Sequence, residues 1–124
     1  MNEKDKMIDK LDELVELSIL YDFYGELLSD HKKRIFEEYV LNDLSLSEIA
    51  ELKGISRQGV YDLVKRCSKE LRDYEIKLKL ISKFDTVKDK LLEVKELVSN
   101  PLSNNRDDLQ EEITRLADDI LKEL

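Results

Sequence analysis

The sequence predicts an all-α protein. Glycine occurs three times and proline once in 124 residues, so very little interrupts a helix. Charged residues make up 40% of the chain and hydrophobic residues 41%, with Leu, Glu, Lys, Asp and Ile enriched, as is typical of amphipathic helices. Apolar residues also recur every three or four positions along most of the chain, which is the spacing of one helix face.

The first two helices are predicted between residues 8 and 41. The apolar spacing favours a helix from Ile8 to Tyr24, which Gly25 would end. A second helix begins near Ser29 or Asp30, since either can cap it, and His31 is expected to be exposed in its first turn. The inward-facing residues are predicted to be Leu11, Leu14, Val15, Leu17, Ser18 and Tyr21, then Ile35, Phe36, Tyr39 and Val40, and the aromatic residues Phe23, Tyr24, Phe36, Tyr39 and Phe84 are interpreted as core.

The third and fourth helices are predicted to form a helix-turn-helix. Ser45 and Glu48 have the S-x-x-E spacing of a capping box, and Leu44 and Ile49 occupy the positions of a hydrophobic staple. Gly54 can end this short helix in the left-handed conformation, and Ser56 can cap the next helix at once. A short helix, a glycine turn and a second helix are the layout of the motif. Its structural residues are Ser45, Glu48, Ile49, Ala50, Gly54, Val60 and Leu63, with Ile55 as a further apolar contact.

One segment of this acidic chain is basic. The formal net charge is −8, yet residues 53–72 carry six Lys and Arg against two acids. The first turn of the second helix of such a motif enters the major groove, where Arg and Gln can bond to guanine and adenine. The alternative is that these cations are only solvent-exposed charges on a helix and bind no ligand. The predicted nucleic-acid contacts, expected to be weak within an acidic protein, are Ser56, Arg57, Gln58, Tyr61, Lys65 and Arg66.

The C-terminal half is predicted to be a long helical arm. No Gly or Pro occurs from Val60 to Asn100, so this stretch is either one long helix or two with a bend. Pro101 interrupts the pattern, and the last helix either folds back or pairs with another chain. We expect a helix-turn-helix domain over 1–72 and a dimerising arm over 73–124, because the apolar stripe is too long for a small domain to cover. The expected homodimer interface includes Leu78, Ile81, Leu91, Val94, Ile113 and Leu116.

Several classes of site are not predicted. Cys67 is the only cysteine and His31 the only histidine, so the sequence has neither a disulfide framework nor metal-ligand spacing. Cys67 is interpreted as a small buried hydrophobe. No acid, base and nucleophile converge, so we expect no enzyme activity, cofactor or metal. The N-terminus lacks the apolar core of a secretory signal, and no apolar run is long enough to span a membrane; we expect a cytoplasmic protein without membrane insertion.

Three stretches resemble the YlxM family of small bacterial proteins, which are helix-turn-helix proteins associated with the signal recognition particle. They are YDFYGELLS at 21–29, LSLSEIAE at 44–51 and SRQGVYDLVKR at 56–66, and S-R-Q-small-V-Y-D is the most specific part. The same module resembles region 4 of bacterial sigma factors, a four-helix unit that reads promoter DNA. The resemblance implies a sigma-region-4-like domain followed by a long helix and a C-terminal helix, with Ser56, Arg57, Gln58 and Tyr61 at recognition positions.

The resemblance also implies a cytoplasmic, non-enzymatic protein that acts in or regulates the signal recognition particle pathway. Its partners would be DNA or RNA, bound weakly, and protein components of that pathway. The alternative is a protein-binding adaptor of the targeting machinery, in which the motif docks on a protein and its charge supplies complementarity without any functional nucleic-acid contact. The residues leave DNA, RNA and protein open as the ligand.

Overall fold

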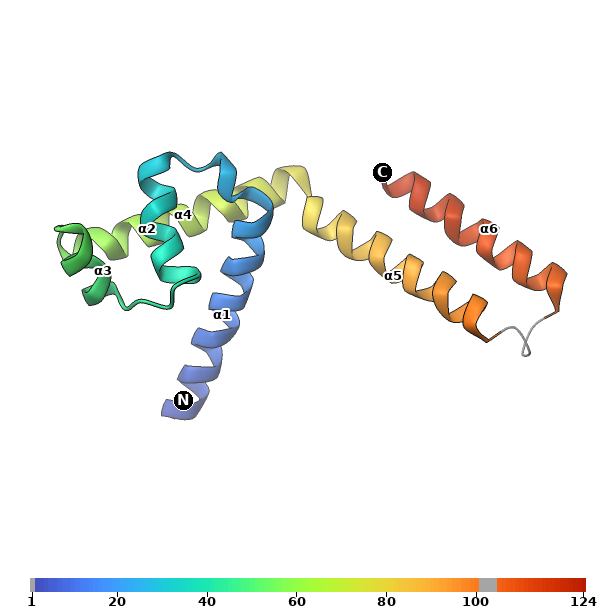
Figure 1. Ribbon diagram of the computed structural model, residues 1–124, viewed down its shortest axis with the longest axis horizontal. Helices are drawn as coiled ribbons and strands as arrows, with labels where there is room; N and C mark the ends of the chain where they lie inside the picture. The colour runs from blue at the N-terminus through green and yellow to red at the C-terminus, as the bar shows by residue number, and fades with distance from the viewer. Residues whose placement is uncertain (1, 101–104) are drawn as a thin grey trace. The chain divides into compact units, whose positions relative to one another are not determined.

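The structure is a computed structural model that describes residues 2–100 and 105–124, and all of its regular structure in these ranges is helical (Figure 1). The all-α prediction is therefore confirmed. The expected interruption at Pro101 lies outside the described residues. Within them, no helix is long and apolar enough to cross a membrane. The elements are α1 (Glu3–Tyr24), the 3-10 helix η1 (Gly25–Leu27), α2 (Asp30–Val40), α3 (Leu46–Lys53), α4 (Arg57–Leu78), α5 (Leu80–Ser99) and α6 (Arg106–Glu123).

The chain divides into two compact units, Met1–Leu78 and Lys79–Leu124. The expected boundary between residues 72 and 73 lies inside α4, which continues to Leu78. Of the two alternatives for residues 60–98, the structure has two helices. They are separated at Lys79, whose φ of 55° is left-handed, a conformation that costs a residue with a side chain about 1–2 kcal/mol. No glycine or proline marks this break in the sequence.

The core of the first unit forms where α4 packs against α1, α2 and α3. The rings of Tyr21 and Phe36 lie 5.9 Å apart, and the Tyr21 hydroxyl donates a hydrogen bond to the Glu37 carboxylate. Burial and this carboxylate raise the pKa of Tyr21 above its usual range. The most deeply buried side chains of the unit are Leu17, Tyr24, Ile35, Phe36, Ile49, Val60, Cys67 and Leu71.

The helix α1 begins five residues before the predicted start at Ile8. Asn2 caps it, because its side-chain oxygen accepts a hydrogen bond from the Asp5 backbone N–H at 2.9 Å. The prediction that Leu11 and Val15 face inward is wrong, since they are 55% and 59% exposed. This helix has apolar residues on two opposite sides, and its buried residues all lie from Leu17 onward. The repeat alone cannot tell which side meets the core.

Gly25 follows α1, as predicted, but for a different reason. Its φ of −57° is ordinary for any residue, so no left-handed turn requires glycine here. A Cβ at this position would lie 2.7 Å from the ring of Tyr21. Gly25 is therefore needed for space beside a core tyrosine.

The start of α2 at Ser29 is confirmed, because the Ser29 hydroxyl accepts a hydrogen bond from the Lys32 backbone N–H at 3.4 Å. His31 is exposed, as expected. Two aromatic residues are not core as predicted: Phe23 is 37% exposed and Phe84 is 55% exposed. The neighbouring Tyr24 takes the inner position instead of Phe23, and α5, which carries Phe84, has no fully buried residue.

The second unit is a hairpin in which α5 and α6 lie antiparallel and side by side (Figure 1). Asn105 caps α6, and the Lys90 ammonium lies 3.9 Å from the Asp119 carboxylate across the pair. The last helix therefore folds back on its own chain, one of the two arrangements that the sequence left open. Leu116 is the one described residue of this unit that is fully buried.

Candidate nucleic-acid interface

The predicted caps and turn of the helix-turn-helix are confirmed by local hydrogen bonds. At the start of α3 the Ser45 N–H donates to the Glu48 carboxylate and the Glu48 N–H donates to the Ser45 hydroxyl, each at 3.1 Å. Gly54 ends α3 with a φ of 69°, and its N–H donates to the Ala50 carbonyl. The Ser56 hydroxyl accepts from the Gly59 N–H at 2.9 Å, which caps α4. Each of these contacts joins residues three or four positions apart, so neighbouring residue types suffice to predict them.

The packing of α3 on α4 departs from the prediction at one residue. Ile49 and Val60 are completely buried between the helices, and Leu63 and Ala50 are half-buried. Ile55, expected as another contact, is 37% exposed. It lies in the turn between the helices, where the left-handed Gly54 redirects the chain away from the core.

Side chains of every predicted nucleic-acid contact are exposed, on the first three turns of α4 or, for Ser56, just before it. Val60 and Val64 of the same turns are buried. Arg57 lies toward the start of α3, where it lines a hollow with Ser45 and Glu48, and the other contacts lie farther round the helix. Ser56 uses its oxygen as the helix cap, which leaves its O–H to donate to a ligand. The exposed predicted contacts, hereafter the recognition face, are Ser56, Arg57, Gln58, Tyr61, Lys65 and Arg66.

Ion pairing divides the basic segment into two parts. Farther along α4, Lys69 pairs with Asp73 at 2.9 Å and Arg72 pairs with Glu16 at 3.0 Å. In the part of the chain that the structure describes, Arg57, Lys65 and Arg66 form no ion pair. Within the basic segment, the cations without an ion pair among the described residues are therefore Lys53 and the three of the recognition face. The sequence did not predict this division, because Glu16 is distant in the chain.

Two contacts order side chains within the recognition face. The Lys65 ammonium lies 5.5 Å from the centre of the Tyr61 ring, within the range of a cation–π interaction. The Gln58 amide donates to the Asp62 carboxylate at 3.0 Å. Asp62 thus occupies one N–H of Gln58 and leaves the amide oxygen and the second N–H for a ligand. It also places a negative charge beside the cations.

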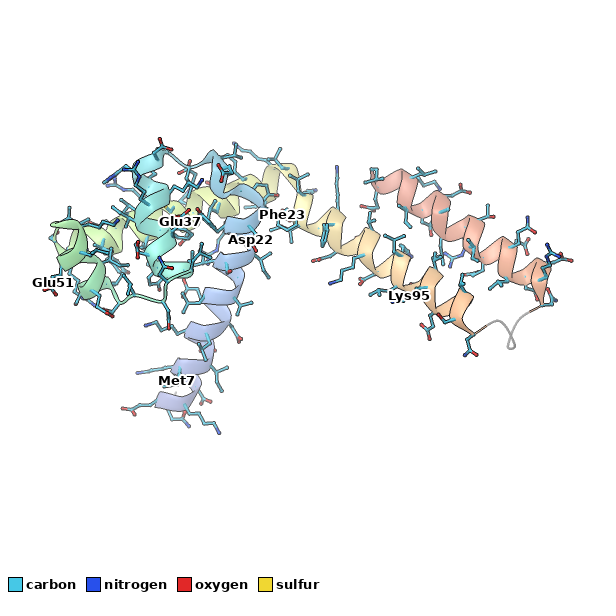
Figure 2. All side chains as sticks on the ribbon, viewed as in Figure 1. Met7, Asp22, Phe23, Glu37, Glu51 and Lys95 are labelled. Atoms are coloured by element: carbon cyan, nitrogen blue, oxygen red, sulfur yellow. The ribbon has the colours of Figure 1, made fainter. Side chains whose placement is uncertain are left out.

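One further cation near the motif was not among the predicted contacts. Lys53 is exposed in the last turn of α3, and the described residues provide no carboxylate partner for it. Lys53 could have been predicted as a contact from the sequence, because it belongs to the basic segment 53–72. Glu51 lies exposed on the same short helix (Figure 2), so the cationic surface does not extend over all of α3.

The Cys67 thiol and the side chains that could bind a metal lie outside the recognition face. Cys67 is fully buried, as expected, and burial raises the pKa of its thiol to about 11. No group of three His, Cys, Asp or Glu side chains among the described residues is arranged to hold a metal ion.

Over residues 11–115 the chain matches the family model UPF0122, described as "Putative helix-turn-helix protein, YlxM / p13 like". It is 42% identical over 113 residues to a UPF0122 protein of Thermoanaerobacter sp. strain X514, covering 91% of this chain and 94% of the relative. A UPF0122 protein of Clostridium perfringens strain SM101 is 43% identical over 109 residues, with 88% and 93% covered. One from Shouchella clausii is 39% identical over 90 residues, with 73% and 83% covered.

Proposed function

Because this chain belongs to the UPF0122 family of YlxM/p13-like helix-turn-helix proteins, we propose that it binds nucleic acid through the recognition face of α4. The observation that carries this proposal is the set of three exposed cations, Arg57, Lys65 and Arg66, which have no carboxylate partner among the described residues. Exposed cations without ion pairs on the first turns of one helix suit a phosphate backbone, whose contacts position a recognition helix.

The binding would be weak and strongly dependent on salt. Only a few cations reach the phosphates, and the net charge of −8 on the whole chain repels nucleic acid at longer range. Gln58 and Arg57 in the first turn of α4 would supply what base recognition there is. A regulatory protein that acts only when another factor brings it to its site would have such an affinity.

Titration of binding against salt tests the proposal. Fluorescence anisotropy with a short DNA duplex and with an RNA hairpin, repeated over a range of salt concentrations, gives the slope of log K against log salt. Arg57→Ala, Lys65→Ala and Arg66→Ala should each reduce the size of this slope by about 0.9 for DNA, since each removes one phosphate contact. The matched control is Lys69→Ala on the same helix, where Asp73 already pairs with the lysine; it should change the slope much less. A slope near zero for the unmutated protein would eliminate the phosphate contact.

We also propose that the protein is non-enzymatic and acts in, or regulates, the signal recognition particle pathway in the cytoplasm. The support is the resemblance of the three quoted stretches and the matched family, which is a helix-turn-helix family and not an enzyme family. The adaptor is kept as a second candidate because Asp62 engages Gln58 and adds negative charge to the recognition face. Capture from lysate with and without nuclease separates the two. Loss of all partners after nuclease supports nucleic-acid binding, and a nuclease-resistant targeting protein supports the adaptor.

The protein is further proposed to act as a homodimer through its second unit. Leu91 is 54% exposed, and Ile81, Val94 and Ile113 are half-buried. Leu78, which is 46% exposed, ends the first unit and is removed from the proposed interface. Leu116 packs inside its own hairpin, so its side chain is used within the chain and is removed from the proposed interface. A two-fold dimer would bring two recognition faces into one molecule, so that it could bind paired half-sites.

A further inference from the structure

The hairpin of α5 and α6 has little core of its own. Among its described residues Leu116 is fully buried, and α5 has no fully buried residue. Two helices that share so few buried side chains are marginal in water, since helices in proteins gain most of their stability from packing an apolar face. The hairpin therefore needs a further apolar surface.

The apolar residues of α5 follow a coiled-coil repeat that α6 covers only on one side. Phe84, Val87, Leu91, Val94 and Val98 are spaced alternately by three and four residues. Val87 and Val94 are half-buried next to α6, whereas Leu91 and Val98 are 54% and 57% exposed. One row of this repeat packs within the hairpin and the other row remains at the surface.

The exposed apolar residues of the two helices lie on the same side of the hairpin. At about 100° per residue, Leu91 lies roughly a quarter turn away from the side of α5 that meets α6. Ala117 lies a similar angle from Leu116, which faces α5, and the antiparallel direction of α6 brings both to one side. The exposed set, hereafter the open face, comprises Leu91, Val98, Ala117, Leu121 and Leu124.

We propose that the open faces of two copies meet and form an antiparallel four-helix bundle in which α5 of each chain packs against α6 of the other. This arrangement rests on the proposed homodimer and specifies its interface. Two hairpins supply four helices of similar length, which together can bury both apolar rows around one core.

Charge selects this arrangement over the one that stacks like helices. Within its bounds α6 carries seven acids and three cations, a net charge of −4, whereas α5 carries four acids and four lysines. Stacking α5 on its own copy would also bring the two acidic α6 helices together, which like-charge repulsion disfavours. Packing α5 against α6 of the second copy places the acidic helices diagonally.

Two lysines favour the same choice. Lys88 and Lys95 are exposed beside the open face, and neither has an ion-pair partner among the described residues. Figure 2 shows Lys95 on the side of α5 turned away from its own α6. In the proposed bundle these lysines face the acidic α6 of the second copy, so their charge would stabilise the dimer.

The mass of the protein in solution, by light scattering after size exclusion, is the first test. The unmutated chain should be a dimer at tens of micromolar, and Leu91→Asp should make it a monomer. Leu92→Asp is the matched control, since Leu92 is equally exposed at 53% but lies on another side of α5; it should remain a dimer. A monomeric unmutated chain would overturn the homodimer altogether. Equal effects of the two substitutions would overturn the open face as the interface.

Charge reversal tests the arrangement without touching the apolar core. The double variant Lys88→Glu, Lys95→Glu should raise the dimer Kd about tenfold, and ~1 M salt should largely remove the difference because the Debye length falls to about 3 Å. The control variant Lys53→Glu, Lys122→Glu makes the same change in net charge away from the open face and should leave the Kd within about twofold. If both double variants still form dimers and change the Kd by the same factor, α5 does not pack against an acidic helix. The proposed arrangement would then be wrong, although the homodimer would stand.

Discussion

Among single residues, Cys67 is the most direct probe of packing in the first unit, because its thiol can be titrated and chemically modified. Its side chain is completely buried, and burial is the main cause that raises its pKa to about 11, with a smaller contribution from the Glu70 carboxylate. Lys32 opposes this shift only in part. The folded chain therefore holds Cys67 as a neutral, inert thiol.

We predict that Cys67 reacts with an aromatic disulfide reagent about a thousandfold more slowly in the folded protein than in urea at pH 8. Reaction requires an opening of the core that costs several kcal/mol. The measurement is the rate of thiol release followed by absorbance. A rate close to that of the unfolded chain would mean that Cys67 is accessible and that the packing of α4 on α2 is looser than described.

The same residue predicts a loss of stability at alkaline pH. The folded pKa is raised above the ordinary value of 9.0, so between about pH 9 and 11 the unfolded chain releases a proton that the folded chain retains. The stabilisation is fully present below pH 9 and is lost as the pH rises toward 11. Urea unfolding at pH 8 and pH 10 should therefore show a larger decline for the unmutated protein than for Cys67→Ala, which has no thiol to titrate. Equal declines would contradict the prediction.

At the level of elements, the helix caps differ in quality. The capping box of α3 uses two reciprocal bonds of 3.1 Å, whereas α2 has one cap bond of 3.4 Å from Lys32 to Ser29. Ser45→Ala should lower the free energy of unfolding by about 0.5–2 kcal/mol, and Ser29→Ala should lower it by less. Glu48→Gln keeps a side-chain acceptor and should cost little. Urea denaturation of the three variants measures their free energies of unfolding. An equal decrease for Ser29→Ala and Ser45→Ala would show that the capping box stabilises the helix no more than a single cap does.

At the level of the whole molecule, the two units differ in how completely they are packed. Apart from Leu116, the fully buried apolar residues of the described chain lie in the first unit. We predict that a fragment of residues 1–78 unfolds cooperatively and independently of concentration. A fragment of residues 79–124 should gain helix only as its concentration rises, because it lacks a core until copies associate. Circular dichroism over a hundredfold range of concentration makes this comparison. Concentration-independent helix in the second fragment would mean that the hairpin is stable alone.

The sequence by itself determined where most helices begin and end in the first unit. Ser29, the pair Ser45 and Glu48, Gly54 and Ser56 act through hydrogen bonds or dihedral angles within one helical turn, so their neighbours in sequence are their neighbours in space. The exposed recognition face was predictable for the same reason. Its residues are positions in the first turns of α4 that the apolar repeat leaves out, together with the cap Ser56.

Only the tertiary structure decided which of two apolar faces is buried and which cations are neutralised. Leu11 and Val15 on α1 have the same composition and spacing as core residues, yet no helix of the first unit covers them completely. Arg72 is neutralised by Glu16 from a helix more than fifty positions away, while Arg57 on the same helix is not. The break between α4 and α5 lies at Lys79, where no glycine or proline in the sequence indicates it. Burial, ion pairing and a strained backbone angle all depend on what lies opposite in space, and a helical repeat carries no information about that.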